Sequence, residues 1–318
     1  MTAQFTWTLD APTGVYKSHA MSERLYYSAI ANAVMMDFVM PLDGFGRKRG
    51  ETMTLTRVSA LTEPSDSSLS ETDRIPEDTF SIGTTSVTVS EFGRSVPFTS
   101  LSEDLSEYNV RNPIQRRLRD QLGLVLDTKA ATAFKDTQIK YSIDGLTSAS
   151  TGTSGSFSST SAENMNVYHV EEIRDLMRAT YSIPPYDGGD YVGVFNTLGL
   201  RGIKRDASWE EWKKYTEPQA KFNSEVGRME EVRFVESWHS NAFGQVGTGS
   251  VLGEGVVFGA ECVGLAEALT PEIRVQINVG DDFGRSHAAA WYGILEFLNI
   301  WGDSANAGEA KSVHVGSA

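Results

Sequence analysis

The sequence is poor in cysteine and has no long apolar run, and both absences restrict what the protein can be. A single cysteine, Cys262, in 318 residues excludes an intramolecular disulfide. Its small and apolar neighbours predict a buried thiol. The longest apolar run, residues 27–42, is too short for a membrane span and contains Asp37. The first 20 residues lack a basic start and an apolar core, so we expect no signal peptide.

Positive charge is also scarce. The chain has 28 Lys and Arg against 42 Asp and Glu, a formal net charge of -14 and a pI of about 4.8. This balance disfavours a nucleic-acid reader, which normally carries a basic face. With 40% hydrophobic residues and a mean hydropathy of -0.27, the composition is that of a soluble protein. We expect one large or two modest domains.

Signatures of enzymatic chemistry are missing as well. No two of the five histidines are four residues apart, and HExxH, CxxC, GxSxG and GxxxxGK[ST] are all absent. "GTGSVLG" (247–253) and "GEGVVFG" (253–259) miss the pattern GxGxxG by one residue, and we interpret both as glycine-punctuated β turns. Carboxylates are plentiful, so counts alone do not exclude a glycosidase pair. We expect no catalytic residue, cofactor or metal.

The N-terminal region predicts an arm followed by a helix. Residues 1 to about 48 contain this helix, from about Ser22 to Val39. Its apolar residues recur at roughly helical spacing: Leu25, Tyr26, Ile30, Val34, Met35 and Phe38.

Residues 49–98 change to strand spacing and predict a long hairpin. The apolar residues of its two arms are Met53 and Leu55, with Arg57 in phase, and Phe80, Ile82, Val87 and Val89. Between the arms, residues 63–78 hold six acids, one arginine and two prolines, so we expect a solvated tip. Arms of this length would project about 40 Å. A two-stranded ribbon is marginally stable alone, so it must lie on its own body or on a neighbour.

A second, longer helix is predicted from Asn112 to about Asp136. Asn112 suits the N-cap, Pro113 the first helical position and Gln115 a capping box. One side carries Ile114, Leu118, Leu122, Val125, Ala130, Ala133 and Phe134. Three arginines near its start, Arg116, Arg117 and Arg119, could touch DNA or pair with a neighbouring acidic surface; the acidic chain favours the second interpretation.

The second half predicts mixed α+β structure. A Ser/Gly/Thr tract at 147–161 is typical of a flexible loop. The segments that follow predict a helix, a Pro/Gly turn, a short buried strand and a charged helix: "VEEIRDLMRATY", residues 184–189, "DYVGVF" and "ASWEEWKKY". The tail, "PEIRVQINVG" and "HAAAWYGILEFLNIW", returns to strand character.

This order of parts resembles the major capsid proteins of tailed bacteriophages, with the fold of the HK-ninety-seven phage shell. The stretches that carry the resemblance are "MSERLYYSAIANAVMMDFVMPL", "GRKRGETMTLTRVSALTEPS", "VSEFGRSVPFTSLSEDL", "NVRNPIQRRLRDQLGLVLDTKAATAF" and "FNSEVGRMEEVRFVES". The N-four-like podovirus branch is the most similar, although that branch commonly has His-Pro where this chain has Asn196-Thr197.

The resemblance implies an α+β fold with four regions. These are an N-terminal arm and first helix (1–48), an extended loop (49–98), a peripheral domain with the spine helix (99–144 and 286–318) and an axial domain (145–285). In "EVGR" (225–228), it implies that Gly227 permits a turn. It also implies that Glu225 pairs with Arg233 of the strand that follows, or that both pair with a neighbouring subunit.

The function implied is self-assembly into hexamers and pentamers that close into an icosahedral shell in the virion, formed in the bacterial host cytoplasm. Portal, scaffolding and cement proteins and packaged DNA are possible partners; no membrane is implied. The residues expected at contacts between subunits are Arg57, Glu63, Arg74, Phe80, Arg94, Arg116, Arg117, Glu225 and Arg233. Two alternatives stay open: another structural virion protein, such as a tail tube or minor capsid protein, and a hydrolase with an unrecognised site.

Overall fold

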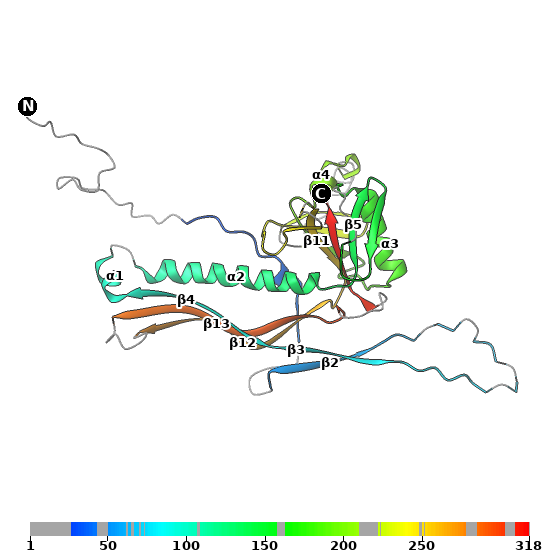
Figure 1. Cartoon of the computed structure of the whole chain (residues 1–318), viewed down its shortest axis with the longest axis horizontal. Helices are drawn as coiled ribbons and strands as arrows, with labels where there is room; N and C mark the ends of the chain where they lie inside the picture. Colours follow the sequence, from blue (N-terminus) through cyan, green and yellow to red (C-terminus); the bar gives the residue numbers. More distant parts are fainter. Residues whose placement is uncertain are drawn as a thin grey trace, which may run out of the picture. The chain divides into compact units, whose positions relative to one another are not determined.

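The computed structural model describes residues 27–42, 50–106, 109–157, 163–209, 222, 224–247, 250, 252–277, 285–302 and 309–317, except residues 62, 65, 66, 70 and 73. The chain divides into two compact units, Met1–Ile30 and Ala31–Ala318. All the elements below belong to the second unit. They form a four-stranded sheet with a long helix, an eight-stranded sheet and a two-stranded hairpin (Figure 1).

The four-stranded sheet has the order β1-β12-β13-β4. Its strands are β1 (Met40–Pro41), β12 (Val263–Ile277), β13 (Ser286–Asn299) and β4 (Ser90–Thr99). β13 lies antiparallel to both β12 and β4, and its burial alternates strictly from residue to residue. This period of two is expected for a sheet that is covered on one face, and it confirms the predicted strand character of the tail.

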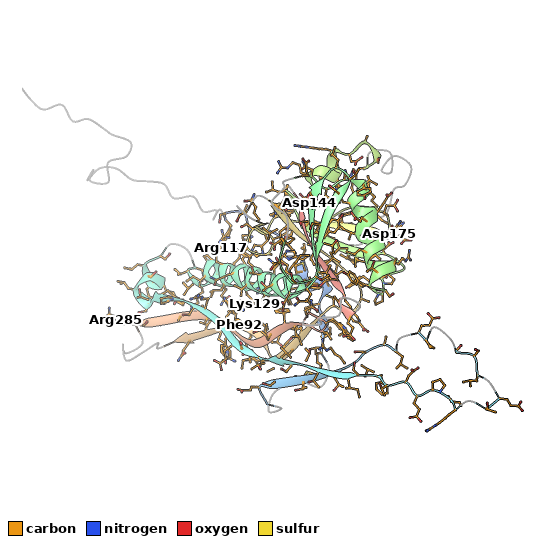
Figure 2. All side chains as sticks on the ribbon, turned by 45° about the vertical axis from the view of Figure 1, so that its right-hand side comes forward. Phe92, Arg117, Lys129, Asp144, Asp175 and Arg285 are labelled. Carbon is orange, nitrogen blue, oxygen red and sulfur yellow. The ribbon has the colours of Figure 1, made fainter. Side chains whose placement is uncertain are left out.

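The long helix that the sequence predicted is present as α2 (Arg111–Lys135), and it packs on this sheet. Its 25 residues span about 37 Å. Leu118 of α2 is buried in one cluster with Phe98, Ala289 and Trp291 of the sheet. On the same side of the molecule, Lys129 lies 4.9 Å from the centre of the Phe92 ring (Figure 2). The helix and the sheet thus bury their apolar sides against each other.

The predicted start of α2 is wrong by a short distance. The N-cap is Val110, and the side-chain oxygen of Asn109, not of Asn112, accepts a bond from the Arg111 N–H at 3.0 Å. Pro113 still falls in the first turn, where its missing N–H costs no intrahelical bond. A short helix, α1 (Ser100–Leu105), precedes α2 and is capped by the hydroxyl of Thr99.

The eight-stranded sheet has the order β6-β5-β14-β11-β7-β9-β8, with β10 on β11. Its strands are β5 (Lys140–Gly145), β6 (Ser148–Gly152), β7 (Tyr191–Asn196), β8 (Glu225–Met229), β9 (Val232–Ser237), β10 (Gln245–Val246), β11 (Leu252–Phe258) and β14 (Ser312–Ser317). The helical segments between them are α3 (Val167–Asp175), η2 (Leu176–Thr180) and α4 (Arg201–Arg205). The predicted helix "VEEIRDLMRATY" (170–181) is confirmed as α3 and η2, and the predicted strand "DYVGVF" is confirmed as β7.

The centre of this sheet is buried on both faces. In β7, Tyr191 and Phe195 belong to one apolar cluster, whereas Val192 and Val194 belong to another that includes Phe134 of α2. Side chains of one strand alternate between the two faces, so both faces of the sheet are covered. The second cluster joins the C-terminal half of α2 to the eight-stranded sheet.

The predicted first helix is wrong over its described part. Residues 27–34 have no regular structure, and only the 3₁₀ turn η1 (Met35–Phe38) follows. The N–H groups of Val34 and Met35 both donate to the Asp127 carboxylate at 2.8 Å, and not to carbonyls of their own segment. Val34, Met35 and Phe38 are nevertheless buried. Tertiary bonds and burial therefore override the helical spacing of this segment, which we call the strap (residues 31–42).

Two segments predicted as loops or turns contain strands. β6 lies within the Ser/Gly/Thr tract, where it pairs with β5. "GEGVVFG" forms most of β11, a strand buried along its whole length. A Cβ at Gly255 would lie 2.0 Å from the ring of Phe195, so this glycine allows close packing and not a turn. The predicted charged helix lies outside the described residues beyond position 209. None of the described helices is long and apolar enough to cross a membrane.

Candidate assembly surface

The predicted hairpin exists, but its paired part is short. β2 (Thr52–Val58) and β3 (Ile82–Thr88) pair antiparallel over seven residues, from Thr52 opposite Thr88 to Val58 opposite Ile82. Seven residues span about 23 Å, less than the arms we predicted. Thr85 and Val87 of β3 are buried, and the alternate residues of β3 are exposed. Phe80 and Ile82 therefore do not share a face with Val87, contrary to the sequence pattern.

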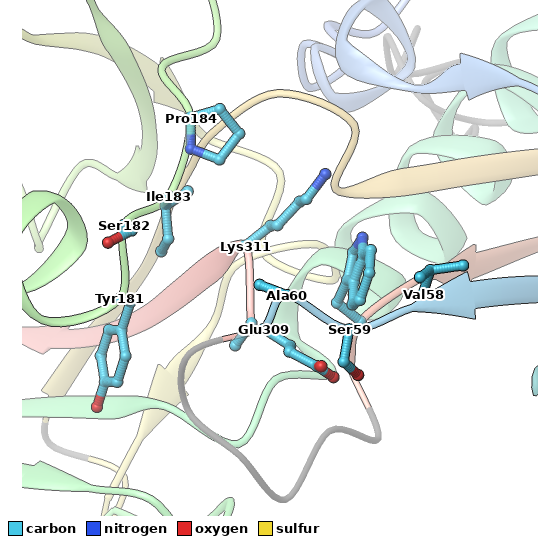
Figure 3. A pocket seen from close by; sticks show the side chains of 11 residues that line it. Val58, Ser59, Ala60, Tyr181, Ser182, Ile183, Pro184, Glu309 and Lys311 are labelled. Atoms are coloured by element: carbon cyan, nitrogen blue, oxygen red, sulfur yellow. The ribbon is translucent and has the colours of Figure 1, made fainter. Parts of the chain in front are cut away.

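The root of the hairpin is attached to the body of the same chain. The Arg57 guanidinium donates to the carbonyl of Ile300 at 3.3 Å, and it lies 5.7 Å from the centre of the Trp301 ring. The ammonium of Lys311 also lies 5.3 Å from this ring. Val58 and its neighbours border a cavity of about 180 Å³ with residues 181–184 and 309–311 (Figure 3). These contacts, together with the burial of Thr85 and Val87, hold the paired part of the hairpin on the body of the same chain.

Beyond the root, the segment between β2 and β3 is exposed. Every described residue from Ala60 to Ile82 is classed as exposed, and the acidic part is the solvated tip that the sequence predicted. Six large apolar side chains of the segment and its borders are more than half exposed: Val58, Leu61, Leu69, Ile75, Phe80 and Ile82. Exposed apolar side chains along one segment make it a candidate contact surface.

The other sequence-predicted contact residues are spread over three elements. Glu63 and Arg74 lie in the exposed segment, where Arg74 forms an ion pair with Glu77 at 2.5 Å. Arg94 lies on β4 opposite Trp291 and is exposed. Arg116 is exposed on α2. Arg117, labelled in Figure 2, lies 3.6 Å from Asp120 one turn further on.

Glu225 and Arg233 are brought together inside the chain. Arg233 donates to Glu225 at 3.0 Å and to Asp190 at 2.9 Å, and Asp190 also accepts from Arg228 at 2.7 Å. The Glu225 side chain is only 1% exposed. This buried group of charges holds the β8–β9 hairpin on the end of β7, and its members satisfy one another.

The expected role of Gly227 is wrong. Gly227 lies within β8, and the turn of this hairpin is made by Glu230 and Glu231, with φ of 49° and 61°. A Cβ at Gly227 would lie 2.8 Å from the Trp209 ring. The glycine therefore makes room for an indole, and Arg174 binds Glu230 at 2.5 Å beside the left-handed turn.

A buried group of charges that the sequence did not predict joins α2 to the eight-stranded sheet. Glu254 of β11 accepts from His314 of β14 at 2.9 Å and from Lys135 of α2 at 3.2 Å. Lys140 of β5 lies 2.9 Å from the other nitrogen of His314 and donates to the Lys135 carbonyl at 2.8 Å. We call these four residues the joint cluster.

Burial and mutual charge determine the protonation of the joint cluster. Burial lowers the pKa of His314 to about 4. The hydrogen bond to Glu254 acts to raise this pKa, whereas the positive charge of Lys140 lowers it further. Burial would raise the pKa of Glu254, but the bonds and charges of His314 and Lys135 outweigh it and lower that pKa to about 2. The members come from positions 135 to 314, so no local spacing reveals them.

The described residues contain no group of three or more His, Cys, Asp or Glu side chains placed to hold a metal ion. Cys262 is buried, as predicted, and burial raises the pKa of its thiol to about 12.

Comparison with known proteins gives a match in structure and none in sequence. No family model and no curated protein matches the chain. Among solved structures, the cyanophage Pam1 capsid asymmetric unit matches with a TM-score of 0.71 at 14% identity, covering 99% of this chain and 98% of that one. The capsid of cyanophage P-SCSP1u gives 0.66 at 12% identity, with 99% of each chain covered. The capsid of Ralstonia phage GP4 gives 0.67 at 13% identity, with 98% of each covered.

These matches extend over nearly the full length of the chain. The protein therefore has the α+β fold of phage capsid proteins, the HK-ninety-seven type.

Proposed function

We propose that the protein is a major capsid protein whose copies assemble into hexamers and pentamers and close into the icosahedral shell around a phage genome. The observation that carries this proposal is the full-length match of the fold to phage capsid structures. The exposed apolar segment between β2 and β3 supports it, because such a segment gains free energy when a second copy covers it. Each contact need not be strong, since closure of the shell multiplies them.

The finer parts of this proposal rest on the sequence. We keep the N-four-like podovirus branch as a prediction, together with the four regions 1–48, 49–98, 99–144 with 286–318, and 145–285. We expect assembly in the host cytoplasm, with portal, scaffolding and cement proteins as candidate partners. Packaged DNA would lie on the inner side without sequence-specific contact; the net charge of -14 supports loose contact.

A structural and non-enzymatic role agrees with the way the described charges are used. The buried acids Asp190, Glu225 and Glu254 are all engaged with cations of the same chain. Within the described ranges, these ion-paired carboxylates hold strands and helices together, as expected for a scaffold.

Negative-stain microscopy of the purified full chain, expressed alone, tests the proposal. We expect shells or hexameric capsomers. Rings that stack into tubes would favour a tail-tube protein instead. A stable monomer at all concentrations, with turnover of generic ester, glycoside or phosphate substrates, would favour a hydrolase and refute the proposal.

A further inference from the structure

We propose that the strap is a clasp that holds two parts of the chain at one angle to each other. One part is the eight-stranded sheet with its helices, and the other is α2 with the four-stranded sheet. When the strap is withdrawn, the two parts rotate against each other. The inference goes beyond the proposed function, because it concerns the single chain and does not depend on assembly.

The two parts are joined covalently at three crossings that lie close together. Residues 136–139 lead from α2 to β5, residues 259–262 lead from β11 to β12, and the segment between β13 and β14 makes the third crossing. All three reach neighbouring strands of the eight-stranded sheet, in the order β5-β14-β11. Backbone hydrogen bonds of 3.0 and 3.1 Å join the second crossing to the third. Connections gathered at one place act as a hinge.

The strap is bound to the eight-stranded sheet away from this hinge. The side-chain amide of Asn32 donates to the Glu236 carbonyl at 2.9 Å, and its oxygen accepts from the Trp238 N–H at 3.0 Å, at the end of β9. β9 is two strands away from β11, which is about 10 Å. Further along the strap, the ring of Phe38 contacts three aromatic rings of this part, at 5.1 to 5.8 Å between ring centres.

The strap is also bound to α2 and to the four-stranded sheet. The buried carboxylate of Asp127 on α2 accepts from the N–H groups of Val34 and Met35, and its second oxygen lies 2.7 Å from His239 in the loop after β9. At the end of the strap, β1 pairs with β12. The strap therefore holds one part at Asn32 and the other through Asp127 and β1.

Bonds away from a hinge must break before the parts can rotate, whereas bonds at the hinge need not. The strap also completes the apolar layer between the parts, because Val34, Met35 and Phe38 are buried in one cluster with Phe134 of α2 and Val235 of β9. Closely packed layers of this kind switch between discrete arrangements and do not deform continuously. The bound strap therefore selects one arrangement.

The strap can be withdrawn without melting a helix or a long strand. Residues 27–34 have no regular structure, so their release breaks tertiary contacts and not a ladder of local bonds. The strap directly follows the compact unit Met1–Ile30, so a pull on this unit acts first on the Asn32 end. Release is favoured only by as much free energy as a partner gains when it binds the withdrawn state.

Distance measurement by electron spin resonance tests the clasp on the full chain, kept unassembled at low concentration. Nitroxide labels are attached at Arg119→Cys on α2 and Glu171→Cys on α3, two exposed positions in different parts. Cys262 does not compete for the label, because it is buried and burial raises the pKa of its thiol to about 12. The width of the distance distribution reports how far the parts rotate.

The release variant, Asn32→Ala/Phe38→Ala, removes both anchors of the strap on the eight-stranded sheet. Ile203→Ala is the matched control, because it removes a buried side chain from the other apolar cluster of this sheet and leaves the strap untouched. Asn32→Asp is a milder variant. Its carboxylate still accepts from the Trp238 N–H but cannot donate to the Glu236 carbonyl.

Hydrogen exchange at the N–H groups of Val34 and Met35 reports whether the strap is bound. We expect wild type and Ile203→Ala to show slow exchange there and one narrow distance distribution. In the release variant both groups should exchange about 100-fold faster, since local opening then costs little. The distance distribution should become about twice as broad, with Asn32→Asp in between. Asn32→Asp decides the test if the double variant does not fold.

Three results would overturn the clasp. One is fast exchange at Val34 and Met35 together with a distribution as narrow as that of wild type. Another is slow exchange in both strap variants, which would show that Asn32 and Phe38 do not hold the strap. A third is an equally broad distribution in Ile203→Ala, which would assign the broadening to lost stability. The proposed function is tested separately, by shell formation of the wild-type chain.

Discussion

The joint cluster makes the stability of the chain depend on acid in a way that one substitution should change. His314 is 5% exposed and lies between the carboxylate of Glu254 and the ammonium of Lys140. The substitution is His314→Gln. A glutamine amide can still donate to Glu254, but it does not titrate, so the variant separates hydrogen bonding from protonation.

The sign and size of the effect follow from the pKa of His314. Burial lowers this pKa from 6.5 to about 4, so between these values the unfolded chain binds a proton that the folded chain does not. The free energy of unfolding must then decrease as the pH falls from about 6.5 to 4. An interval of about 2.5 pH units corresponds to about 3 kcal/mol. Between pH 4.5 and about 2, the unfolded chain also binds a proton at Glu254 that the folded chain does not, because the pKa of this carboxyl is lowered to about 2 on folding, and this removes further stability.

Urea unfolding of the unassembled chain, followed by tryptophan fluorescence between pH 7.5 and 4.5, measures this slope. We expect His314→Gln to be less stable than wild type at pH 7.5 but to lose about 2.5 kcal/mol less on acidification to pH 4.5, which covers about 2 of these pH units. Burial also lowers the pKa of His169, which adds to the slope of both proteins and cancels in the comparison. His287→Gln, a control in the other sheet, should retain the slope that His314 supplies. Equal losses in wild type and His314→Gln would refute the assigned protonation.

Three further substitutions test the packing described above. Gly255→Ala should destabilise the chain by about 2 kcal/mol, because the new methyl group overlaps the Phe195 ring; an unchanged urea midpoint would contradict this. Asp127→Ala should cost about 3 kcal/mol and increase proteolysis of the strap, since two buried N–H groups lose their acceptor. Glu225→Ala should cost about 2 kcal/mol and lower the yield of assembled shells, with Arg233 left on Asp190 alone; wild-type yield and stability would argue against a structural role.

The sequence predicted those helices and strands in which apolar residues recur on one side, because that side is buried and the opposite side is exposed to water. Residues 111–135 repeat their apolar side chains at helical spacing, and residues 286–299 alternate, because each element has one apolar side that must be buried. The hairpin and its acidic tip were predictable for the same reason, since residues that stay in water carry charge and proline. The order of these parts also indicated the fold.

Only the tertiary structure decided the strap, the role of the glycines and the pairing of buried charges. The strap has helical spacing, but Asp127, more than 90 positions away, binds its backbone. Glycine is needed at positions 227 and 255 because aromatic rings from other elements pack directly against the backbone there. The order of strands in the eight-stranded sheet, together with the end of α2, brings the four residues of the joint cluster into contact: Glu254, Lys135, Lys140 and His314. A local sequence pattern indicates which side of a helix or strand is exposed to water. It does not indicate which distant residue packs against the buried side, because that depends on the packing of the whole chain.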